Sequence, residues 1–216
     1  MTDDARHSPV TAWVWGGGFL IASALLPLVA VASLNAPGSL AAVSWIGMLT
    51  FTAALLVFAF GWRGRGSVVA RRTLGTVALT VWALLGPAAA LTAALLPPYD
   101  DGSASLYSAL YYVEILAWIV AGTLSVVEIA RADVVVRPWN RAPAWALGIV
   151  VGAGVLTQIG MVAVAGRLDG PEMLGLLSGL SSLVATLVPM LLGILAIVLA
   201  LRTEPRPTVQ VYPTGS

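Results

Sequence analysis

The sequence contains no cysteine and no lysine, it has one histidine, and charged residues make up only 10% of its 216 positions. Without cysteine the chain forms no disulfide, thiolate zinc site or iron–sulfur cluster. Without lysine it forms no Schiff base, and His7 lies in the N-terminal tail, away from any apolar segment that could hold a cofactor. The sequence also lacks a G-x-x-x-x-G-K-[ST] loop and an H-E-x-x-H helix. It therefore predicts a protein that is not an enzyme and that binds no metal or cofactor.

The few charges that are present are scattered along the chain. Net charge is +1, and the eleven basic residues, all arginine, form no basic face that could follow a phosphate backbone, so nucleic acid is not an expected partner. Hydrophobic residues make up 59% of the chain and there are 22 glycines, whereas soluble domains carry about 25% charged residues to cover their surface. The expected partner for most of this surface is the lipid bilayer.

Six apolar stretches are long enough to cross a bilayer, which requires about 20 helical residues. The sequence therefore predicts an all-α integral membrane protein, a polytopic bundle of six transmembrane helices with a turn at residues 35–39 between the first two. Residues 1–12 are predicted to be a cytoplasmic tail and residues 203–216, rich in proline, a disordered cytoplasmic tail. The transmembrane domain covers residues 13–202, and its predicted spans are residues 13–34, 40–62, 73–96, 107–130, 144–166 and 173–201.

Arginine placement predicts the orientation of these spans. With six spans, ten of the eleven arginines lie on the side that carries both termini, and only Arg167 lies on the other side. Because segments rich in arginine stay in the cytoplasm, both termini are predicted to be cytoplasmic. The lack of lysine beside abundant alanine, leucine, valine and glycine suggests a GC-rich bacterial genome. The predicted location is therefore the bacterial cytoplasmic membrane.

The fourth span carries a polar and aromatic stripe. Residues on it recur at alternating spacings of four and three, which places them on one face of a helix: Tyr107, Tyr111, Glu114, Trp118, Ala121, Ser125 and Glu128. Such a face is expected to point toward protein or water. Glu128 is explained by an ion pair with Arg131, three residues later, and Asp133 with Arg137 forms a similar pair in the following loop.

Glu114 is the candidate proton or cation site, together with Gln158 and Tyr111. Glu114 lies about 10 Å below the predicted membrane boundary at 1.5 Å per residue, and Gln158 lies about 12 Å down on the fifth span. Equal depth allows a hydrogen bond between Glu114 and Gln158. An intramembrane acid is costly and marks ion pathways, but a protonated or tyrosine-bonded acid that sets helix register explains the same residue. The sequence leaves both interpretations open.

Small residues mark surfaces for close helix packing. Gly148 and Gly152 form a ridge near the cytoplasmic side of the fifth span, and Gly175 and Gly179 form a ridge near the outer side of the sixth. These two ridges differ in depth, and Gly160 is the better depth match for Gly179. Each ridge is thus expected to meet another helix of the chain or a partner subunit.

Pro87 and Pro189 are predicted to kink the third and sixth spans. Prolines at matching positions in two halves of three spans are found in transporters built from inverted repeats, although prolines are also common in membrane helices of other kinds. Two functions follow from the sequence. The first is a non-enzymatic accessory or assembly subunit, acting as a homo-oligomer or with a membrane partner. The alternative is a small proton- or cation-coupled transporter or channel that uses Glu114.

Overall fold

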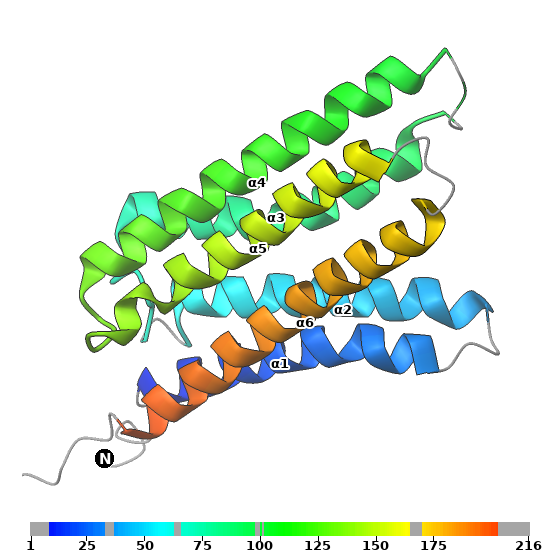
Figure 1. The fold of residues 1–216 in the computed structure, drawn as a ribbon. Helices are drawn as coiled ribbons and strands as arrows, with labels where there is room; N and C mark the ends of the chain where they lie inside the picture. The colour runs from blue at the N-terminus through cyan, green and yellow to red at the C-terminus, as the bar shows by residue number, and fades with distance from the viewer. Residues whose placement is uncertain are drawn as a thin grey trace, which may run out of the picture.

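The structure is a computed structural model that describes residues 9–32, 37–62, 66–97, 100, 102–164 and 170–202. Within these ranges the chain is all-helical, without β-strands (Figure 1). A short 3₁₀ helix, η2 (Trp139–Arg141), precedes the fifth helix. The long helices are α1 (Pro9–Ala32), α2 (Pro37–Phe60), α3 (Thr73–Leu95), α4 (Ala104–Ala132), α5 (Ala142–Val164) and α6 (Gly170–Arg202).

All six long helices have the length and apolar composition needed to cross a membrane. The prediction of an all-helical chain with six such segments is confirmed, and this composition indicates an integral membrane protein. Each predicted span falls on one helix, and the ends differ by a few residues. Residues 1–8, residues 35 and 36 of the predicted turn and the tail at 203–216 lie outside the described residues, whereas residues 37–39 of that turn belong to α2.

The six helices form a ring in chain order. Each helix contacts its two neighbours in the sequence, and α6 closes the ring against α1. Within the described helices, no backbone comes close to that of a helix across the ring. The α4–α5 seam makes the sparsest contact of the six, whereas α1 packs extensively against both α2 and α6. An even number of helices brings Pro9 and Arg202 to the same end of the ring, here called the terminal end (Figure 1).

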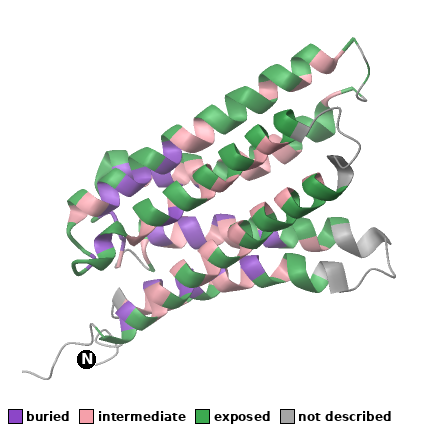
Figure 2. Ribbon diagram, viewed as in Figure 1, coloured by how far each residue is buried: buried purple, intermediate pink, exposed green. Residues whose placement is uncertain are grey.

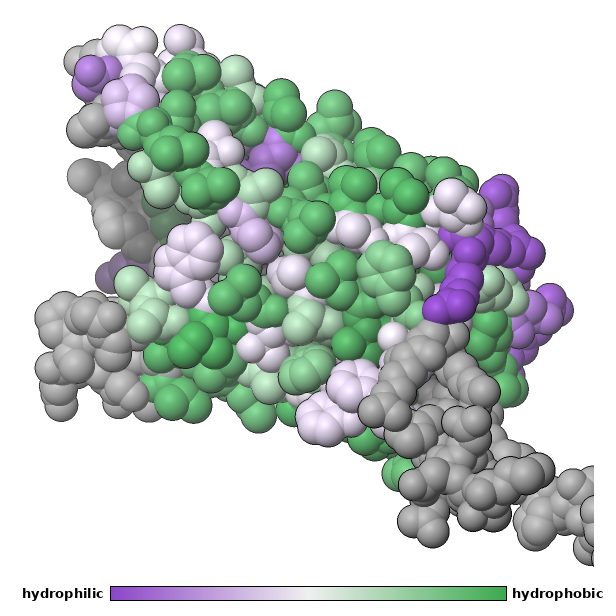
Figure 3. All heavy atoms as spheres, turned by 180° about the vertical axis from the view of Figure 1, so that it is seen from behind, coloured by the Kyte–Doolittle hydropathy of each residue, from purple (hydrophilic) through white to green (hydrophobic). Residues whose placement is uncertain are grey.

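The core lies in the terminal half of the bundle (Figure 2). In α4, for example, the first buried residue is Ala121, and everything from Ala104 to Val120 is exposed or only partly buried. Polar colour in Figure 3 also gathers strongly at this end, while the middle of the face shown is mainly hydrophobic. The described arginines all lie at the terminal end, at positions 71, 72, 131, 137, 141 and 202. Because the buried residues lie mainly in the terminal half, the far half of the bundle is loosely packed.

The loop from α2 to α3 folds back into the terminal end. Trp13 Nε1 donates a hydrogen bond to the carbonyl of Gly66 at 2.8 Å, and the Ser67 hydroxyl donates one to the carbonyl of Ala59 at 2.6 Å. Val68 and Val69 are consequently buried beneath the helices. Gly66 has a φ of 81°, which a residue with a side chain rarely adopts, so glycine is needed for the chain to turn here.

The seam between α1 and α6 depends on two glycines that the sequence pattern did not single out. A Cβ built on Gly17 would lie 2.6 Å from the carbonyl oxygen of Gly193, and one on Gly193 would lie 2.6 Å from that of Gly17. The two backbones therefore approach as closely as glycine permits. This reciprocal contact joins the first helix to the last and closes the ring.

At the far end, Asp100 and Ser103 form a reciprocal pair just before α4. Ser103 N–H donates to Asp100 Oδ1 at 2.7 Å, and the backbone N–H of Asp100 donates to the Ser103 hydroxyl at 2.9 Å. The hydrogen bonds from Ser103 hold the pKa of Asp100 below its ordinary value. This exposed acid is thus explained by the local turn. Glu172 lies exposed in the first turn of α6.

Candidate functional site: an apolar cavity and an exposed polar cluster

The ring of helices surrounds a partly open cavity of about 170 Å³ in its terminal half. Every long helix contributes to the lining, and all the lining side chains are aliphatic or aromatic. Val68 from the α2–α3 loop and Val135 from the α4–α5 loop lie at its terminal end. The sequence did not predict this cavity. Its lining suits a hydrocarbon group and offers no side chain that could coordinate an ion.

Two tryptophans face each other on the α3–α4 side of the cavity. Trp82 and Trp118 stack edge to face with ring centroids 5.4 Å apart. The indole N–H of Trp82 is buried and has no hydrogen-bond partner among the described residues. Trp118 belongs to the predicted stripe of α4.

The stripe of α4 divides into two parts. Ala121, Ser125 and Glu128 are buried against the protein, as a polar face was expected to be. Tyr111 and Glu114, nearer the far end of the same helix, are exposed. Burial along α4 begins only at Ala121, so one continuous stripe is buried only in its terminal half (Figure 2).

The three residues predicted as a proton or cation site lie at the α4–α5 seam, outside the cavity. Gln158 Nε2 donates a hydrogen bond to the hydroxyl of Tyr111 at 3.2 Å. This contact links the two helices, but it involves Tyr111 rather than Glu114. Among the described residues, the carboxylate of Glu114 has neither a hydrogen bond nor an ion pair. Its side chain is exposed.

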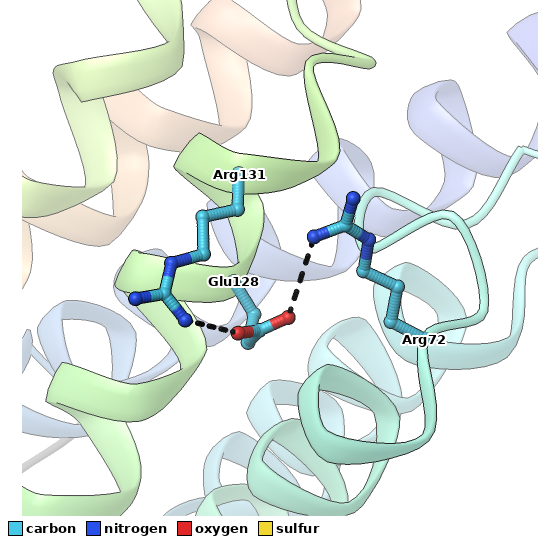
Figure 4. A network of polar contacts seen from close by, with 3 residues as sticks. All are labelled: Arg72, Glu128 and Arg131. Atoms are coloured by element: carbon cyan, nitrogen blue, oxygen red, sulfur yellow. Dashed lines mark hydrogen bonds and ion pairs between the residues drawn. The ribbon is translucent and has the colours of Figure 1, made fainter.

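Glu128 forms the most buried ionic cluster of the described chain (Figure 4). Its side chain is only 6% exposed, and its two oxygens lie 3.2 Å from Arg131 Nη1 and 3.9 Å from Arg72 Nη1. The predicted pair with Arg131 is confirmed, and so is the loop pair of Asp133 with Arg137, at 3.7 Å. Arg72 was not predicted to take part. It comes from the start of α3, so the cluster ties the α2–α3 loop to α4.

Gly75 makes room for this cluster. A Cβ at this position would lie 2.8 Å from the Cβ of Val69 and 3.0 Å from the Cβ of Glu128. The small residue therefore lets α3, the preceding loop and α4 meet around the carboxylate. Because the two arginines are half exposed or more, solvent reaches the outer side of the cluster. Its evident role is structural, at the terminal end of the ring.

The glycines predicted to form ridges behave differently from one another. A side chain at Gly148, Gly152, Gly175 or Gly179 would meet no atom of the described chain within 4 Å. Among the described residues, these ridges therefore do not pack against another helix of the chain, which was one of the two predicted options; the other was a partner subunit. Gly160 is packed, but against Leu177 rather than Gly179, because a Cβ at this position would overlap the end of the leucine side chain. The ridges are left facing outward from α5 and α6.

Pro87 and Pro189 both lie inside helices, in α3 and α6. Pro189 also lines the cavity.

No protein-family model, curated protein sequence or solved structure matches the chain. Its function is therefore inferred from the geometry of the cavity, from the exposed polar residues Tyr111, Glu114 and Gln158, and from the open glycine ridges.

Proposed function

We propose that this chain is a non-enzymatic membrane subunit that assembles with a further membrane helix through the outer surface of α4 and α5. The observation that carries the proposal is that Glu114, within the candidate membrane span of α4, is exposed and has no partner among the described residues. A charged side chain at the centre of a bilayer costs about 2.5–3.5 kcal/mol on insertion scales. A partner that supplies a hydrogen-bond donor would remove most of this cost.

The adjoining surface supports the same proposal. Only 6% of the membrane window of α5 is buried, the lowest share of the six helices. Gly148 and Gly152 present a flat ridge on this helix that nothing in the described chain covers. Small residues at this spacing allow a second helix to approach closely in a membrane. The partner is either another copy of the chain or a different membrane protein.

The alternative is a small proton- or cation-coupled transporter or channel that uses Glu114. The intramembrane acid favours it. Such a protein would need a hydrated path to the carboxylate, whereas the cavity inside the ring has a purely apolar lining that does not include Glu114. Glu114→Gln, which removes the ionisable proton, separates the two functions: it should leave subunit assembly largely intact, whereas it should abolish any proton- or cation-dependent flux into reconstituted vesicles.

Assembly can be tested by native mass spectrometry of the full chain purified in a mild detergent. We expect a complex of two or more chains. Gly152→Leu should raise its dissociation constant about tenfold, equivalent to ~1.4 kcal/mol, by preventing close helix approach. Gly154→Leu is the matched control, because Gly154 also has open space around it but lies on a different face of α5. A lone chain that shows cation flux blocked by Glu114→Gln would replace the subunit proposal with the transporter.

We further propose that both termini are cytoplasmic and that the membrane is the cytoplasmic membrane of a bacterium. The concentration of arginine at the terminal end supports this orientation. Reporter domains fused after Arg137 and after Thr203 should be active in the cytoplasm, and those fused after Asp101 and Asp169 should be active outside. Reversed activities at all four sites would invert the orientation, and the same reading at two adjacent sites would remove the span between them.

A further inference from the structure

The terminal half of the bundle also carries a groove on its outer surface, between α5 and α6. This groove has a volume of about 640 Å³ and is lined mainly by aliphatic residues, among them Ile149 from α5 and Leu191 and Ile194 from α6. Arg202, the last residue of α6, lies at the terminal end of the groove. The indoles of Trp139 and Trp145 also line the groove. The groove is therefore apolar along its length and cationic at one end.

The groove and the internal cavity are neighbours. Six residues line both spaces, which means that a single layer of side chains separates them: Trp139, Ala146, Val188, Leu192, Leu195 and Leu199. Pro189 lies within this layer's stretch of α6. Because proline has no backbone N–H, the helix lacks one of its hydrogen bonds here, and this weakens its resistance to bending. Side chains of the layer can thus move apart at lower cost than in an unbroken helix.

We propose that the groove binds an anionic phospholipid. The phosphate of this lipid contacts Arg202, and one of its acyl chains reaches through the layer of shared side chains into the cavity. Arg202 is exposed and forms no ion pair with a described residue, so its charge is available to a phosphate. Indole rings favour the headgroup boundary, where the phosphate of a bound lipid would lie.

The dimensions and chemistry of the cavity match the end of an acyl chain. An apolar protein cavity of about 150 Å³ stays dry and holds a benzene-sized hydrocarbon, so the cavity of about 170 Å³ has space for several methylene groups but not for a whole lipid. Its lining is apolar apart from the buried indole N–H of Trp82. The remainder of the chain would lie along the groove.

The test uses the full-length protein in nanodiscs that contain phosphatidylglycerol with a photoreactive diazirine at the end of one acyl chain. After illumination, crosslinked residues are identified by mass spectrometry of peptides. Crosslinks to Leu79 and Trp118 are expected, because these residues line the cavity from α3 and α4, on elements that do not border the groove. Crosslinks confined to groove residues such as Leu191 and Ile194, or to a second copy of the chain, would overturn the proposal.

Two variants test the two ends of the lipid separately. Ala146→Leu adds volume to the layer and should abolish crosslinks to Leu79, whereas Ala163→Leu, at an exposed position near the far end of α5, should leave them unchanged. Arg202→Gln should lower the preference for phosphatidylglycerol over phosphatidylcholine roughly fivefold, the effect of one arginine near a charged membrane surface. An unchanged preference in Arg202→Gln would contradict the headgroup contact even if Ala146→Leu failed to fold. Neither readout depends on subunit assembly.

Discussion

Replacing Gly193 by leucine should lower the free energy of unfolding by about 3 kcal/mol, near the upper end of the usual range for overpacking. The new Cβ would lie 2.6 Å from the carbonyl oxygen of Gly17 and 2.8 Å from Cγ1 of Ile21. A backbone carbonyl inside a helix cannot rotate away, so α1 and α6 would have to separate. Because this seam closes the ring, the loss should appear as a lower midpoint of thermal unfolding in detergent.

Gly179→Leu is the matched control for this experiment. It makes the same substitution in the same helix, at a position where a side chain would meet nothing within 4 Å in the described chain. We expect its unfolding midpoint to stay close to that of the unmodified protein. Equal losses at the two positions would mean that leucine harms α6 for reasons other than packing, and the close contact of Gly17 with Gly193 would then not hold the ring together.

Removing both arginines from the Glu128 cluster, by Arg72→Ala together with Arg131→Ala, should destabilise the protein by about 3 kcal/mol. A buried charge that loses its partner typically costs about 3–5 kcal/mol, and the partial exposure of the cluster's arginines places the expected value at the lower end. Each single variant should cost much less, because the other arginine still neutralises the carboxylate. The measurement is the free energy of unfolding by denaturant in detergent micelles.

Adding Glu128→Gln to the double arginine variant should recover most of that loss, since the amide keeps the shape of the side chain without its charge. Arg137→Ala is the control for arginine loss in general. Its pair with Asp133 is highly exposed, so the effect should stay within about 0.5 kcal/mol. Failure of Glu128→Gln to rescue the double variant would show that the arginines act through packing rather than through charge.

The Glu128 cluster shows which contacts can be predicted from the spacing of residues within one helix and which cannot. Glu128 and Arg131 are three residues apart on one helix, so their pairing follows from helix geometry and was predicted. Arg72 is distant in the sequence, and its contact with Glu128 depends on how the α2–α3 loop packs beneath α4. No local periodicity encodes that packing. The same reasoning applies to Gly75, whose small size matters only because Val69 and Glu128 converge on it.

The glycine ridges show a second feature that the sequence does not predict, namely what a helix face contacts. Spacing of four residues placed Gly148 with Gly152, and Gly175 with Gly179, on common helix faces, but it could not show what those faces meet. In the structure they meet no described atom, while a close backbone contact between glycines joins residues 17 and 193. Such a contact between the first and last helices arises from ring closure, which brings together segments far apart in the chain.

The sequence by itself determined the number of helices, their limits to within a few residues and the gathering of arginine at one end, because each depends on local composition and on the length needed to cross a bilayer. Only the tertiary structure decided which helices are neighbours, which half of the α4 stripe is buried and where Glu114 lies relative to the apolar cavity. Those features depend on the packing of side chains from distant segments, and in a mainly apolar sequence nearly every helix face could serve equally well as a contact surface.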